Sequence, residues 1–244
     1  WRERQSRLVK AILATPKKSG QAWSAAIRER GRVLESWLNE FIELGPRSRV
    51  LQVGLRGQGE VHHFSCGIRY GIDPLAGVMA DQGMLKWGQV RWASARGEEM
   101  PFPADNFQAI ILSDILGSVE SPERVLAEAQ RCLNRDGVLL ISFTSRWDRQ
   151  KRGTFLRLGN RKLKPLRRVN RMRTLKWCRQ AGFELLTDAD AIQTHVEDAV
   201  VESTIKTISH RATPYLILRP AEQPVAGVSG VGDATVSSAR QLAE

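Results

Sequence analysis

Short apolar segments between residues 49 and 143 constrain the fold of this chain more than any other feature. They span 49–54, 68–73, 90–93, 107–113 and 137–143, each has the length of a strand, and turns separate them. Most are apolar at nearly every position, as in strands buried on both faces of a parallel sheet. The alternation of strands and helices predicts an α/β fold with a doubly wound, mainly parallel sheet of about seven strands.

The helix expected between the last two of these strands is clearly marked. Ser121 can cap its first turn, and Pro122 suits the first helical position. A buried stripe follows at helical spacing, and residues 134–137 are expected to form the turn into the next strand. Later in the chain we expect a helix ending at Gly182 with a strand behind it, and a last strand at 214–220 near the sheet edge.

Residues 1–44 are predicted to form a helical cap ahead of the α/β domain, which spans 45–220. Apolar residues recur there at spacings of three, four and seven, and Gly31 is expected to loosen or divide the helix. The cap is interpreted as a layer that covers the sheet, with a lid over a ligand as the alternative. Residues 221–244 have few large apolar groups and are predicted to be a disordered tail.

The net charge of +11 is concentrated in one segment. Between Arg146 and Arg179 there are 14 basic residues and one acid, interleaved with apolar side chains. A solvated helical face or docking to an anionic membrane surface would both explain this pattern. No recognised RNA-binding module accompanies the charge, so nucleic acid is not an expected partner.

The cysteines and the hydropathy bear on location. The three cysteines are far apart and form no C-x-x-C pair, which fits a reducing cytoplasm better than a disulfide framework. No stretch approaches the roughly 18 apolar residues of a membrane span. A cytoplasmic protein, peripheral to the inner face of a membrane, is therefore expected.

The segment 49–61, RVLQVGLRGQGEV, is a predicted strand that runs into a glycine-rich turn. Asp73 ends the next strand, nineteen residues after Gly54. In doubly wound folds an acid there accepts hydrogen bonds from the ribose of an adenosine cofactor, although Asp73 could also cap the turn beside Pro74. Nicotinamide enzymes share this arrangement, so it does not identify the cofactor.

The segment Ala95–Phe143 closely resembles the methyltransferase type 11 family of class I S-adenosylmethionine-dependent methyltransferases. The counterparts of the family's motifs are Glu98-Glu99, Met100-Pro101-Phe102, Phe107-Gln108, Ser113-Asp114, Pro122 and Asp136-Gly137. The resemblance implies S-adenosylmethionine as cofactor, held at the carboxyl ends of the first, second and fourth strands.

The resemblance also implies roles for individual residues. A metal site is not expected, because no partnering cysteine or acid cluster accompanies His62 and His63. The implied cofactor-binding residues are Gln52, Gly54, Gly57, Gly59, Asp73, Glu98, Met100 and Ser113. Asp114 would face the acceptor and is the candidate general base. Two alternatives stay open: Glu98 and Glu99 as a solvated pair, and Asp114 as a helix cap.

The glycine turn departs from the family pattern at three places. Gln52 stands where the family has an acid, and Arg56 and Gln58 stand at two expected glycines. The chain is expected to be a methyltransferase for a small-molecule acceptor or for a lipid-linked or saccharide acceptor, with weakened cofactor binding. The alternative is a methyltransferase-fold protein that has lost catalysis and serves as a binding or regulatory partner.

Overall fold

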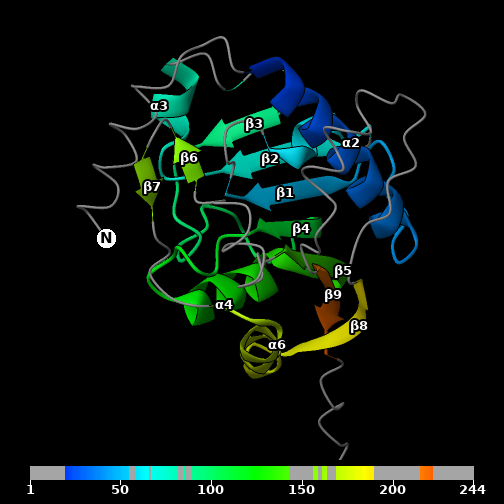
Figure 1. The fold of residues 1–244 in the computed structure, drawn as a ribbon. Helices are drawn as coiled ribbons and strands as arrows, with labels where there is room; N and C mark the ends of the chain where they lie inside the picture. The colour runs from blue at the N-terminus through cyan, green and yellow to red at the C-terminus, as the bar shows by residue number, and fades with distance from the viewer. Residues whose placement is uncertain are drawn as a thin grey trace, which may run out of the picture.

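A seven-stranded sheet dominates the computed structural model. The structure describes residues 20–54, 59–65, 67–81, 85, 90–142, 156–158, 161–163, 169–189 and 215–221. The strand order is β3-β2-β1-β4-β5-β9-β8 (Figure 1). The strands are β1 (Arg49–Val53), β2 (Ile68–Ile72), β3 (Val90–Ala93), β4 (Phe107–Ser113), β5 (Leu133–Ser142), β8 (Phe183–Ala189) and β9 (Tyr215–Pro220). The first five are parallel to one another, and β9 is antiparallel to its two neighbours, β5 and β8. The predicted doubly wound α/β fold is confirmed.

Helices cover both faces of the sheet. Helix α2 (Gly20–Asn39) lies on one side, and α4 (Pro122–Cys132) and α6 (Arg171–Gln180) lie on the other (Figure 1). Side chains of β1 alternate between the two layers, with Val50 in the α2 core and Leu51 in the α4–α6 core. This double burial is why the strand segments are apolar throughout.

Helix α2 passes through Gly31 without a break, so of the two expected effects, loosening or dividing the helix, the division is wrong. Its packing explains the residue instead. A Cβ atom at Gly31 would lie 2.6 Å from the carbonyl oxygen of Glu60 in η1, a 3₁₀ helix (Glu60–His63). Leu34 and Leu38, further along α2, are fully buried against the sheet, as expected of a covering layer.

One further boundary differs from expectation. The segment 134–137 lies within β5, which begins directly at the end of α4 rather than after a separate turn. Strand β9 lies between β5 and the edge strand β8, so it is near the sheet edge, as expected.

The remaining elements are short. Helix α3 (Ala76–Asp81) follows β2, and strands β6 (Leu156–Leu158) and β7 (Arg161–Leu163) pair antiparallel as a hairpin in the basic segment. The rest of residues 146–168, the first 19 residues and the expected disordered tail beyond Ala221 lie outside the described residues. Among the described helices, none is long and apolar enough to cross a membrane.

The cap of α4 gives a first testable prediction. The Ser121 hydroxyl accepts a hydrogen bond from the backbone N–H of Arg124 at 3.2 Å, as the sequence predicts for an N-cap. Ser121→Ala should lower the free energy of unfolding by about 1 kcal/mol, because it leaves this donor without its acceptor. Urea denaturation checks the value, with Ser121→Asp as the control that keeps an acceptor. Equal stability of the alanine and aspartate variants would contradict the assignment.

Candidate cofactor site at the carboxyl edge of the sheet

The glycine turn begins where β1 ends beside β2. Gly54 has a φ of 86°, in the left-handed region that favours glycine. Its N–H donates to the carbonyl of Ile72 at 2.9 Å, and a Cβ atom there would lie 2.1 Å from Cγ2 of Ile115. Gly59, with a φ of 70°, ends the turn and precedes η1. Gly57 lies outside the described residues.

Asp73 follows Ile72 directly, so it lies at the same edge as Gly54. Its carboxylate is half-buried, and Oδ1 accepts from the backbone N–H of Leu75 at 2.8 Å. Asp73 thus makes the turn contact that was the alternative to ribose binding. A carboxylate has about four acceptor positions, so one such bond is compatible with further donors.

Gln52 and Ser113 lie side by side on β1 and β4 and are almost completely buried. The Gln52 amide nitrogen donates to the Glu60 carboxylate and to the Ser113 hydroxyl at 3.2 Å. Ser113 in turn donates to Glu60 at 3.0 Å, and the Gln52 carbonyl accepts from the N–H of Val61 at 2.9 Å. Both ends of the Gln52 side chain therefore already bind protein groups.

Arg30 of α2, whose side chain is 26% exposed, completes this cluster at its outer side. Its Nε atom lies 3.3 Å from Oε1 of Glu60, and its guanidinium carbon lies 5.4 Å from the ring centroid of Tyr215. Burial raises the pKa of Glu60, but the Arg30 charge and the hydrogen bonds to the carboxylate outweigh it, so this pKa lies below its usual range. Glu60 is ionised at neutral pH. We call Arg30, Gln52, Glu60, Ser113 and Tyr215 the Glu60 cluster.

Ser142 is a further buried polar residue at the carboxyl edge of the sheet, beside two members of the Glu60 cluster. It pairs with Ser113 on β4 and with Tyr215 on β9, and it is 1% exposed. Its hydroxyl has no hydrogen-bond partner among the described residues. A buried hydroxyl at the end of β5 is therefore available to a water molecule or a ligand.

Asp114 leaves β4 in an unusual conformation. Its φ is 56°, and its N–H donates to the carbonyl of Ser142 at 3.0 Å. Burial lowers the pKa of Arg30, whereas Tyr215, Glu60 and Asp114 raise it, and the net shift is upward. The Asp114 charge thus contributes to the raised pKa of Arg30. Ser121 rather than Asp114 caps the following helix.

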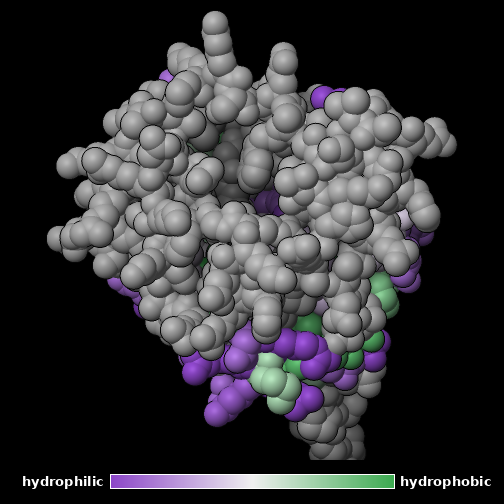
Figure 2. All heavy atoms as spheres, viewed as in Figure 1, coloured by the Kyte–Doolittle hydropathy of each residue, from purple (hydrophilic) through white to green (hydrophobic). Residues whose placement is uncertain are grey.

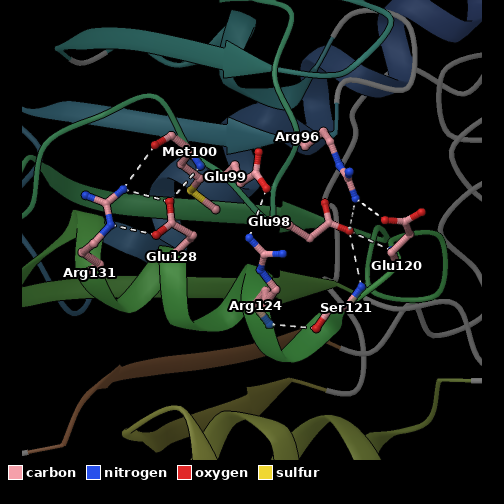
Figure 3. Close-up of polar contacts among 9 residues, drawn as sticks. All are labelled: Arg96, Glu98, Glu99, Met100, Glu120, Ser121, Arg124, Glu128 and Arg131. Atoms are coloured by element: carbon pink, nitrogen blue, oxygen red, sulfur yellow. Dashed lines mark hydrogen bonds and ion pairs between the residues drawn. The ribbon is translucent and has the colours of Figure 1, made fainter.

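Glu98 and Met100 hold the loop after β3 against α4 (Figure 3). Glu98 is 4% exposed and accepts from the N–H of Glu120 at 2.8 Å, with Arg96 at 3.5 Å. The solvated-pair alternative therefore does not describe Glu98. The Met100 N–H donates to Glu128 at 2.8 Å, and its side chain is part of the α4–α6 core. Adenine contacts for these two residues stay predictions.

Glu98 and its neighbour differ in their surroundings. Glu99 is 65% exposed and pairs with Arg124 at 3.1 Å (Figure 3). Only this second carboxylate matches the expected solvated pair.

Sequence reasoning missed Arg30, Glu60, Ser142 and Tyr215. Glu60 had a signal, because it directly follows the last glycine of the turn. Ser142 had one too, since it ends a predicted strand as Ser113 does. Arg30 and Tyr215 are 185 residues apart in number and meet only through the packing of α2 on the sheet, which no local pattern encodes.

Comparison with known proteins agrees with this geometry. Residues 51–141 match the family described as methyltransferase domain. The ubiquinone/menaquinone biosynthesis C-methyltransferase of Vibrio campbellii is 26% identical over 144 residues, which cover 56% of this chain and 49% of that protein. An uncharacterised protein of Methanocaldococcus jannaschii is also 26% identical, over 104 residues, 41% of this chain and 47% of that protein. The chain thus spans about half the length of these curated relatives.

Solved structures share the fold at lower identity. A putative sarcosine dimethylglycine methyltransferase from Galdieria sulphuraria has a TM-score of 0.55 and 13% identity, with 79% of this chain and 85% of that chain covered. The cyclase SpnF has a TM-score of 0.51 and 18% identity, with 78% and 80% covered. Residues 51–141 thus match the methyltransferase domain family, and the described structure has the fold of class I S-adenosylmethionine-dependent methyltransferases.

Proposed function

We propose that this protein binds S-adenosylmethionine and transfers its methyl group to a small-molecule acceptor or to a lipid-linked or saccharide acceptor. The observation that carries the proposal is the placement of Asp73. The carboxylate ends β2 beside Gly54, whose left-handed backbone opens the glycine turn, and both lie within the matched segment. Ribose hydroxyls are donors, so a carboxylate acceptor at this edge suits them.

The cofactor, when bound, supplies an electrophilic sulfonium methyl group, so the chain mainly has to position the acceptor. Asp114 lies at the end of β4 on the same edge and is the candidate to take a proton from an acceptor hydroxyl. Ser142 offers a buried hydroxyl next to it. These roles follow from placement at one edge of the sheet.

A binding or regulatory protein without catalysis is the alternative. It is favoured by the Gln52 side chain, whose carbonyl and amide both bind protein groups. Structures with this fold include the cyclase SpnF, so the fold does not by itself determine the reaction. Cofactor binding separates an intact site from a lost one.

Calorimetric titration with S-adenosylmethionine tests the proposal. We expect saturable binding by the wild type and about 10- to 100-fold weaker binding by Asp73→Ala, because hydrogen bonds to a charged group are lost. Asp81→Ala, which removes an exposed carboxylate at the end of α3, is the matched control and should bind like the wild type. Absence of binding heat at millimolar cofactor would favour the non-catalytic alternative.

The exposed face of α6 supports a lipid-linked acceptor. Helix α6 contains no acidic residue, and its exposed positions include Arg171, Arg173, Lys176 and Arg179. Met172 among them is 72% exposed. Figure 2 shows a mainly hydrophilic surface over α6 with a pale apolar spot within it. Basic and apolar groups on one face suit the interface of an anionic membrane.

Vesicle sedimentation tests this docking. Lys176→Glu/Arg179→Glu should reduce binding to phosphatidylserine vesicles at least about tenfold, since each basic residue near such a surface contributes about 1 kcal/mol. Arg47→Glu/Arg135→Glu changes the net charge equally at exposed positions outside α6 and should bind like the wild type. Equal binding of the wild type to phosphatidylserine and pure phosphatidylcholine vesicles would rule the proposal out.

A further inference from the structure

The N-terminal helix contacts the end of the glycine turn through backbone. At Gly31, α2 approaches η1 so closely that a Cβ atom would lie 2.6 Å from the Glu60 carbonyl and 2.9 Å from Cβ of His63. The first of these neighbours is backbone, which cannot rotate away. The position of α2 and the position of Glu60 are therefore fixed relative to each other.

Glu60 is also the residue that directly follows the turn. Gly59, with its left-handed φ of 70°, precedes it, and the Val61 N–H is held by the Gln52 carbonyl on β1. The two ends of the turn are thus anchored at Gly54 and at Glu60. Any change in the position of Glu60 shifts the end of the segment that would approach the cofactor.

The charges of the cluster explain why β1 carries Gln52. The Glu60 carboxylate is 8% exposed and already accepts from the Gln52 amide. An acid at position 52 would place a second carboxylate within hydrogen-bonding distance of the first, and two such like charges oppose each other's ionisation. The family has a negative charge at this strand position. In this chain the negative charge lies instead on Glu60, which is hydrogen-bonded to the residue at that position.

Arg30 compensates the buried negative charge of Glu60. Removing the cation would leave the carboxylate unpaired and would strongly destabilise the folded protein, so Glu60 depends on its ion pair with Arg30 at 3.3 Å. The partner comes from α2, outside the matched segment 51–141. The cofactor turn is thus held by a helix that the family match does not include.

We propose that Arg30 and Glu60 together replace the strand acid in positioning the S-adenosylmethionine turn, with Arg30 as a positioning residue that acts through Glu60. This inference rests on the proposed function, because it concerns the same cofactor site. It makes α2 part of that site rather than only a cover for the sheet.

Calorimetric titration with S-adenosylhomocysteine, paired with thermal unfolding of each variant, tests the inference. Arg30→Met and Glu60→Gln should each bind about 10- to 100-fold more weakly than the wild type, because the turn loses a charge-supported anchor. Arg30→Lys should recover part of the affinity, since it keeps the cation. If Arg30 had only a structural role, Arg30→Met and Arg30→Lys variants of equal thermal stability would bind S-adenosylhomocysteine equally.

Glu35→Gln is the matched control on the same helix. The Glu35 carboxylate is 7% exposed and accepts from the Ser65 N–H at 2.8 Å, so it anchors α2 after η1 rather than at the turn. It should lower the thermal stability while the cofactor affinity stays within about twofold. If Glu35→Gln weakened binding as much as Arg30→Met, the effect would be general loosening of α2 and the inference would be wrong.

A double variant keeps the test decisive if a single variant does not fold. Arg30→Met/Glu60→Gln removes both charges, leaves no buried charge unpaired, and should fold while binding weakly. Wild-type affinity in Arg30→Met or in the double variant overturns this inference alone. Failure of the wild type to bind overturns the proposed function and this inference with it.

Discussion

Strands β1 and β4 are paired on both sides and covered on both faces, so polar side chains at their carboxyl ends must find partners inside the protein. Gln52 and Ser113 are 0% and 1% exposed, and neither has access to water. A buried polar group without a partner is costly, and this cost organises the edge of the sheet. Glu60 satisfies both side chains, and Arg30 neutralises the carboxylate that does so.

The same constraint changes how the departures of the glycine turn are understood. A glutamine in place of an acid reads as a lost cofactor contact when the strand is considered alone. In the folded chain the Gln52 amide donates a hydrogen bond to the neighbouring Glu60 carboxylate, so Gln52 and Glu60 together occupy the place of the strand acid. Glu98 matches a cofactor motif and also has a structural role, because it pairs with Arg96 and holds the backbone of Glu120 just before α4.

The order and type of the main elements could be predicted from sequence because burial on both faces leaves a strong apolar signal. The Ser121 cap was predictable for a similar reason, since the hydroxyl acts within one turn. Gly31 was misread because a glycine that permits close packing and one that breaks a helix look identical in sequence. Asp73 and Gly54 could be placed at one edge through strand topology, whereas the Arg30–Tyr215 contact required the three-dimensional packing of distant segments.

The place of β9 has a consequence for how the sheet is completed during synthesis. Strand β8 leaves the ribosome before β9, yet among the described strands it pairs with β9 alone, and β9 pairs with β5 on its other side. Until residues 215–220 emerge, Leu139 and Ile141 of β5 lie on an unpaired strand edge, which is a template for wrong pairing. Tyr215 lies on the same strand. The buried polar groups along the carboxyl edge of the sheet are therefore complete once β9 has been synthesised.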